Sequence, residues 1–122
     1  MKLLTSLLAA TLVVTTPAVL AQAWSPSRNV EIVVGFAPGG GVDRTARALE
    51  RALTTQKLVN AGASVANKPG GNTTIAYQYL NQRPPDGHTV MVYGQTIFTA
   101  HITGASALTH TDFTPIATLF SE

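Results

Sequence analysis

One stretch of the sequence, residues 30–51, constrains the fold more than any other. It begins with a short run of apolar, mostly β-branched residues, namely Val30, Ile32, Val33, Val34 and Phe36. Such a run is typical of a strand that is covered on both faces, as in a parallel α/β sheet. Ala37–Gly41 then ends the strand with three consecutive glycines. Because glycine has no Cβ, this turn can adopt positive φ angles and a ligand can approach its main chain closely.

The residues that follow the glycines have the spacing of an amphipathic helix. Apolar side chains recur at steps of four, three and four residues, at Val42, Ala46, Leu49 and Leu53. This spacing places them on one stripe of a helix. The helix therefore begins directly after the glycines, and its free N–H groups and positive dipole end form a site for an anion.

The first 23 residues have the pattern of a secretory signal peptide. Lys2 precedes an apolar run, and Ala21-Gln22-Ala23 closes it as an A-x-A cleavage site. A membrane anchor is disfavoured because threonines and Pro17 interrupt the run. We expect cleavage after Ala23 or Ala21 and a periplasmic protein whose residues 24–122 form one domain or part of one.

Composition excludes some classes of function. The formal net charge is only +2 and no Lys/Arg cluster exists beyond one helix face, so we expect no nucleic-acid partner. The sequence contains no cysteine, so no disulfide can form and stability must come from packing.

The rest of the chain alternates between strand and helix patterns. We expect strands at 63–66 and 89–93, a helix at 74–82, and the start of a fourth strand within 113–119. The intervening turns are rich in glycine and proline, and Asn72 and Thr73 are both good N-cap residues for the second helix. That helix offers Ile75, Tyr79 and Leu80 to the core. The order predicts an α/β fold, a mostly parallel sheet flanked by helices.

Three polar or glycine-rich loops follow the predicted strands. They are Ala37–Gly41, Lys68–Thr73 and Gly94–Thr96. Right-handed crossovers place all such loops at the carboxyl ends of parallel strands, where ligands bind in open α/β sheets. The residues alone therefore predict an anion-binding α/β domain, without naming the ligand.

Four segments resemble one known family. Phe36-Ala37-Pro38-Gly39-Gly40-Gly41-Val42-Asp43 is similar to the signature loop of the Bug, or TctC-like, periplasmic solute-binding proteins, the receptors of tripartite tricarboxylate transporters. Asn67-Lys68-Pro69-Gly70-Gly71 resembles the second ligand loop of that family. The segments 85–89 and 112–115 are similar to later family stretches, and all four occur in the family order behind a signal peptide.

The resemblance implies a two-lobed receptor of the type II periplasmic-binding fold that closes on a small organic carboxylate and delivers it to membrane transporter subunits. It implies no catalytic residue, no cofactor and no metal. In the family the first loop binds a ligand carboxylate through backbone N–H groups and ordered water, and the residue at Asp43 faces a polar or amino group of the ligand. The implied ligand-binding residues are Phe36, Ala37, Pro38, Gly39, Gly40, Gly41, Asp43, Gly70, Gly71, Asn72, Thr73, Gln95 and Thr96.

Two departures from the family pattern stand out. Asn72 and Thr73 occupy positions where the family often has further glycine, and they are expected to reshape the pocket. The chain also stops where a second lobe is expected to begin. We therefore expect an N-terminal piece of a receptor that binds carboxylates weakly or undetectably on its own.

An exported α/β hydrolase is the alternative among enzymes. Ser64 is its candidate nucleophile, but the segment lacks the second glycine of a nucleophile elbow. His88, His101 and His110 are too widely spaced for a helical metal pair. A dinucleotide-binding fingerprint fails because Arg44 takes the place of its third glycine. A purely structural module would not need three converging loops of this kind.

Overall fold

The computed structural model describes residues 24–119, so the predicted signal peptide lies outside the described residues. A small parallel sheet forms the centre, with β1 (Val30–Val34) between β2 (Ala63–Asn67) and β3 (Thr89–Val92). Val30 is in register with Ala63 on one side, and Glu31 with Thr89 on the other. The predicted α/β class with a parallel sheet is confirmed.

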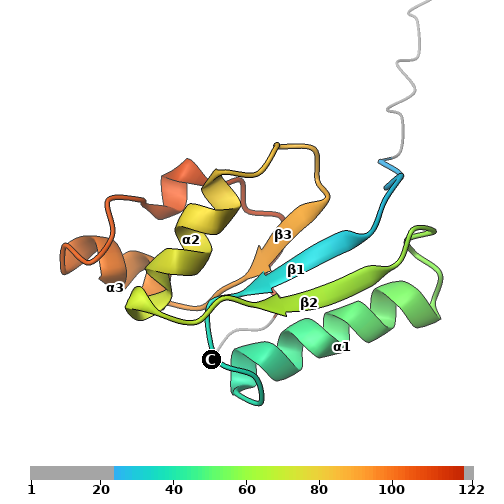
Figure 1. The fold of residues 1–122 in the computed structure, drawn as a ribbon, viewed down its shortest axis with the longest axis horizontal. Helices are drawn as coiled ribbons and strands as arrows, with labels where there is room; N and C mark the ends of the chain where they lie inside the picture. The colour runs from blue at the N-terminus through green and yellow to red at the C-terminus, as the bar shows by residue number, and fades with distance from the viewer. Residues whose placement is uncertain (1–23, 120–122) are drawn as a thin grey trace, which may run out of the picture.

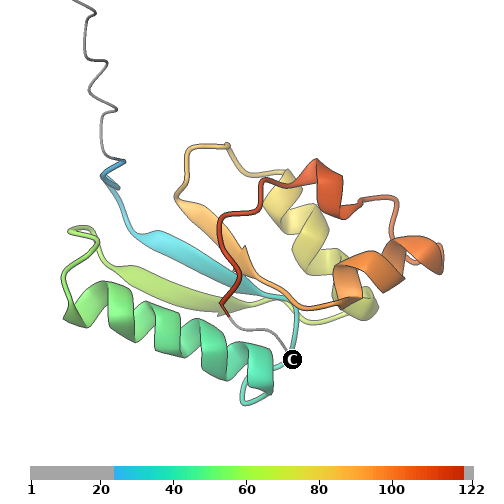
Figure 2. The ribbon, with the colours of Figure 1, turned by 180° about the vertical axis from the view of Figure 1, so that it is seen from behind.

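Helices cover both faces of the sheet (Figure 1). The long helix α1 (Gly41–Thr55) lies against one face, and α2 (Thr74–Asn81) and α3 (Thr96–Ile102) lie on the other. Two short 3₁₀ helices, η1 (Gly71–Thr73) and η2 (His110–Asp112), precede α2 and follow α3. Seen from behind, α1 runs alongside β2 and β1 for most of the length of the sheet (Figure 2). The molecule is thus a three-layer arrangement around β1.

The core under α1 is built by the alternation of β1. Ile32 and Val34 point toward α1 and are completely buried together with Ala46. The predicted helix stripe is confirmed, because the remaining three of its residues pack on this cluster. The partly buried residues that pack against the cluster of Ile32, Val34 and Ala46 are Phe36, Val42, Leu49, Leu53, Ala63, Val65, Val90 and Val92.

The opposite face has a second core around Tyr77, Ile97 and Ala100, which are all almost completely buried. The prediction of which side of the second helix faces the core was wrong. Ile75 is 50% exposed, and Ala76 and Tyr77 are the buried residues of α2. Left-handed backbone just before α2 sets the direction of its first turn. With only eight residues, α2 is too short for its apolar pattern to fix which side faces inward.

The predicted fourth strand is absent from the described part of residues 113–119. The segment instead leaves η2, whose capping box joins Thr109 and Asp112, and runs as irregular chain. Phe113 packs its ring 6.1 Å from that of Tyr77, and Pro115 has no N–H to donate to a sheet. The ring of Phe113 therefore anchors the start of this segment on the second core, whereas residues 114–119 are exposed.

Candidate functional site

The loops that follow the three strands meet at the carboxyl edge of the sheet. We call Ala37–Gly41 the glycine loop and Lys68–Thr73 the second loop. The side chain of Asn67, at the end of β2, donates to the Phe36 carbonyl at 3.0 Å and so joins the two. The Thr73 hydroxyl in turn lies 3.5 Å from that of Thr96 at the start of α3. The sequence analysis correctly placed these loops on one edge.

The glycine loop leaves the start of α1 without a cap. The N-cap Gly40 has no side chain to offer, and the first backbone bond of the helix runs from the Arg44 N–H to the Gly40 carbonyl at 3.0 Å. Within residues 24–119, no acceptor pairs with the N–H groups of Gly40, Gly41 and Val42. Together with the helix dipole, such free donors favour an anion.

The three glycines of this loop differ in whether the backbone conformation or the surrounding space requires glycine. Gly39 has φ +93°, a backbone conformation that other residues adopt only with strain. Gly40 has φ −73° and ψ 174°, which any residue can adopt. A Cβ on Gly41 would meet no atom within 4 Å, and one on Gly40 would meet only the Ala37 carbonyl at 3.8 Å. Folding alone therefore does not require glycine at 40 and 41, whereas the close approach of a ligand to the main chain would.

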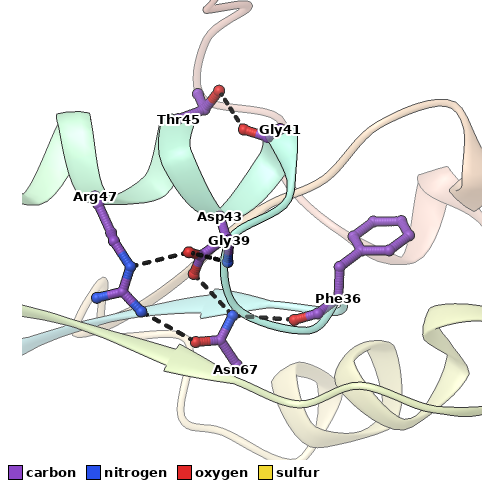
Figure 3. Close-up of polar contacts among 7 residues, drawn as sticks. All are labelled: Phe36, Gly39, Gly41, Asp43, Thr45, Arg47 and Asn67. Atoms are coloured by element: carbon purple, nitrogen blue, oxygen red, sulfur yellow. Dashed lines mark hydrogen bonds and ion pairs between the residues drawn. The ribbon is translucent and has the colours of Figure 1, made fainter.

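The carboxylate of Asp43 holds the loop from behind (Figure 3). Its Oδ2 accepts from the Gly39 N–H at 2.8 Å and from Arg47 Nε at 3.0 Å, and its Oδ1 accepts from Asn67 Nδ2 at 2.9 Å. Arg47 also donates to Asn67 Oδ1 at 3.4 Å. The side chain of Asp43 is only 2% exposed. One carboxylate thus fixes the glycine loop, helix α1 and the end of β2 against one another.

These partners stabilise the charged form of Asp43. The hydrogen bond from Arg47, followed by those from Gly39 and Asn67, lowers the pKa of the Asp43 carboxyl from 3.8 to about 2, against the opposing effect of burial. Its position differs from the one that the family resemblance implies. Both carboxylate oxygens are engaged inside the protein, and the side chain does not face outward toward a ligand. The structure therefore gives Asp43 a positioning role in the loop.

The second loop has an unusual backbone. Gly70, Gly71, Asn72 and Thr73 all have positive φ, although only the first two are glycine. Thr73 is 2% exposed, and a Cβ on Gly35 would lie 2.8 Å from its methyl group. Thr73 occupies the predicted N-cap position of α2, but its side chain does not cap the helix, and its hydroxyl donates to the Asn72 carbonyl at 2.5 Å. Its close packing against β1 holds this strained loop in place.

The third loop contributes hydroxyl groups. Thr96 starts α3, and its Oγ1 lies 3.0 Å from the buried hydroxyl of Tyr77. Gln95 precedes it on the exposed surface, with its carbonyl accepting the Phe98 N–H at 3.0 Å. Thr96 and Thr73 therefore lie side by side, whereas no side-chain contact ties Gln95 to the other loops within residues 24–119.

The sequence analysis missed three residues that support the loops. Arg47 and Tyr77 were given no role at the site, and Asn67 was quoted only as part of a motif. The spacing of Asp43 and Arg47 by four residues is a sequence signal for an ion pair on a helix. The part played by Asn67 could not be read in this way, since its partners lie 24 and 31 residues away.

The rival sites find little support in residues 24–119. Ser64 lies toward the amino end of β2, where its hydroxyl accepts from Asn29 Nδ2 at 2.8 Å. No group of three or more metal-ligating side chains gathers in this part of the chain, and none of its helices is both long and apolar enough to cross a membrane. A hollow of about 580 Å³ follows β3, lined by Met91, Tyr93 and Phe113 among others, but it includes no residue of the glycine loop or the second loop.

Comparison with known proteins gives partial matches only. No family model matches the chain. It is 38% identical over 85 residues to a UPF0065 protein of Bordetella bronchiseptica, covering 70% of this chain and 24% of that protein. UPF0065 proteins of Bordetella pertussis and a Pseudomonas strain are 35% and 34% identical over 74 and 67 residues, covering 61% and 55% of this chain. These two matches span 22% and 19% of the relatives, so less than a quarter of each of the three proteins is represented.

Proposed function

We propose that this chain forms part of an extracytoplasmic solute receptor and captures a small organic carboxylate. The receptor delivers that ligand to a membrane transporter of the tripartite tricarboxylate type. Its role is to bind and release the ligand without chemical change. The glycine loop is the carboxylate-binding element, with Thr73 and Thr96 beside it at the same edge of the sheet.

One observation carries the proposal: within residues 24–119, the N–H groups at the start of α1 have no acceptor, and they lie next to glycines that leave open space. A carboxylate that approaches Gly40 and Gly41 would find backbone donors, the positive end of a fifteen-residue helix and no intervening side chain. A small neutral ligand would gain far less from such a site. Small anions are therefore the class of ligand that this geometry favours.

Two independent lines support a receptor over other anion-binding proteins. The loop sequences resemble those of the Bug receptors, and the relatives named above are UPF0065 proteins that match 85 and 74 residues of this chain. The fold adds a third argument, because the glycine loop, the second loop and Thr96 come from three consecutive strand–helix connections. Such an edge is where ligands bind in parallel α/β sheets.

An NMR titration tests the proposal directly. Succinate added to the ¹⁵N-labelled chain should shift the amide signals of Gly40, Gly41 and Val42 first. One lobe alone is expected to bind weakly, near or above about 1 mM, which corresponds to roughly −4 kcal/mol. Gly40→Val should remove these shifts, since its side chain would cover the approach while its backbone angles suit valine. Ala48→Val adds the same branched side chain on the exposed side of α1 and should leave them unchanged.

The extracytoplasmic location has its own test. If the predicted signal peptide functions, the exported protein should start at Trp24 or Gln22, and N-terminal sequencing of the periplasmic fraction will show this. Protein that retains Met1–Leu20 after fractionation would contradict the predicted export route without affecting the proposed binding site.

A further inference from the structure

We propose that Arg47 determines the charge selectivity of the glycine loop, by cancelling the negative charge of Asp43 behind it. This inference rests on the proposed function and concerns a residue that does not itself reach the open face of the loop. Arg47 acts through Asp43 and is therefore a positioning residue for the ligand's charge. Without Arg47, an anionic ligand that approaches the loop would meet the uncompensated negative charge of Asp43.

The geometry brings the two charges together directly behind the loop. Gly39 and Arg47 donate to the same oxygen of Asp43, at 2.8 and 3.0 Å (Figure 3). The Asp43 carboxylate is therefore one hydrogen bond away from the chain segment whose N–H groups find no acceptor within residues 24–119. Because it is 2% exposed, water screens its charge poorly on that side. Arg47 is 43% exposed and supplies the compensating charge from the solvent side.

A carboxylate in the first turn of a helix interacts favourably with the same dipole that would attract an anionic ligand. Without Arg47, the charge of Asp43 would offset much of the positive potential at the start of α1 and would repel the carboxylate of a ligand. Arg47 forms the only ion pair of Asp43 within residues 24–119, and its second donor reaches Asn67 Oδ1 at 3.4 Å. The pair lets Asp43 keep its structural hydrogen bonds while the loop stays attractive to anions.

The proposal predicts an effect that grows with the charge of the ligand. Arg47→Met should weaken binding of doubly charged succinate by roughly three- to tenfold at low ionic strength, and binding of singly charged butyrate by less. Raising the salt concentration should reduce both losses. Asp43→Asn added to Arg47→Met should restore succinate binding toward the wild-type value, since asparagine keeps an acceptor for the Gly39 N–H without the charge.

Hydrogen exchange provides a measurement that needs no carboxylate ligand. Exchange of exposed amides at neutral pH and above is catalysed by hydroxide, itself an anion, so its rate reports the local potential. Arg47→Met should slow exchange at Gly40 and Gly41, and the double variant should recover the wild-type rate. A merely structural role for Arg47 predicts the opposite sign, because a loosened loop exchanges faster.

Succinate binding and hydrogen exchange should both be measured on the full chain. Arg51→Met is the control, because it removes an equal charge farther along α1. Slower exchange with weaker succinate binding in Arg47→Met alone supports the proposal. Slower exchange in a chain whose wild type shows no succinate response at Gly40 and Gly41 supports the role of Arg47 without supporting the proposed function. Exchange and binding that are unchanged, or faster exchange, would overturn the inference about Arg47.

Discussion

The glycine loop and the second loop lie side by side but are built in opposite ways. In the glycine loop only Gly39 has a positive φ, and side chains added at 40 or 41 would meet open space. In the second loop four consecutive residues have positive φ, and a Cβ on Gly70 would lie 2.6 Å from the Ile75 side chain. The first loop is relaxed and open, whereas the second is strained and is anchored by Thr73, its one buried residue.

This difference indicates a division of roles at the edge of the sheet. Open space next to free backbone donors is expected of the element that contacts a ligand. Strained residues such as Asn72 and Thr73 persist only where their surroundings hold them, and Thr73 is held between Gly35 and the start of α3. This contrast fits the proposed function, in which the glycine loop binds the ligand and the second loop forms a wall beside it. The predictions that follow test this contrast.

The largest loss of stability is expected where the second loop packs on β1. Gly35→Ala places a Cβ 2.8 Å from the Thr73 methyl carbon and 3.3 Å from the Ala76 Cβ. Overpacking of this kind should lower the free energy of unfolding by about 3 kcal/mol. Urea unfolding of the double variant Gly35→Ala/Thr73→Gly should show recovery, since glycine at 73 removes the clashing atoms and suits φ +69°. Equal stability of the two variants would contradict the packed-wall interpretation.

A smaller loss is expected for Gly70→Ala. Gly70 has φ 126° and ψ 159°, a region that is almost restricted to glycine, so alanine should destabilise the fold by about 2 kcal/mol. Part of the clash with Ile75 can be relieved by rotation of that flexible, exposed side chain. Thermal unfolding measures the change, and Ile75→Ala in the same background tests whether strain or contact dominates. A Gly70→Ala protein as stable as the wild type would show that the loop can relax.

Acid should weaken the attachment of the glycine loop. The pKa of Asp43 is about 2 in the folded protein and below its ordinary value of 3.8, so the charged carboxylate stabilises the fold above about pH 4. That contribution should disappear as the pH falls from about 4 to about 2. Urea titrations at several pH values should show the stability difference between wild type and Asp43→Asn shrinking over this range. A difference that stays constant down to pH 2 would mean that these hydrogen bonds do not depend on the charge.

The smallest predicted change has the opposite sign. Gly41→Ala should stabilise the protein by about 0.4–1 kcal/mol, because Gly41 lies in the first turn of α1 with ordinary φ and has room for a methyl group. The same variant should bind succinate less well. Stability from thermal unfolding and binding from NMR should therefore move in opposite directions, which would distinguish a functional glycine from a structural one. A destabilised Gly41→Ala protein would contradict this reading of the loop.

The sequence predicted the parts of the fold that have strong local patterns. The apolar run of β1 and the stripe of α1 are long and regular, and both were placed correctly. The phase of α2 was missed, because left-handed residues before an eight-residue helix decide its orientation. The segment after Phe113 was also missed, since its packing on Tyr77 is a long-range contact without a local signal.

The candidate site was predictable in its chain segments but not in its contacts. Glycines before a helix pattern are visible in the sequence, and they indicate an anion site through general properties of helix ends. The position of Asp43 could not be foreseen in the same way. Its partners Gly39 and Arg47 are four residues away, but the third partner, Asn67, is brought by folding from 24 residues away.

A crystal structure of the chain soaked with succinate would test the central claim most directly. We expect one carboxylate of succinate within about 3 Å of the N–H groups of Gly40 and Gly41, or bridged to them by one water, with Thr73 and Thr96 beside it. The Asp43 carboxylate should remain bonded to Gly39 and Arg47. Succinate bound instead in the hollow along β3, with the glycine loop empty, would contradict the account.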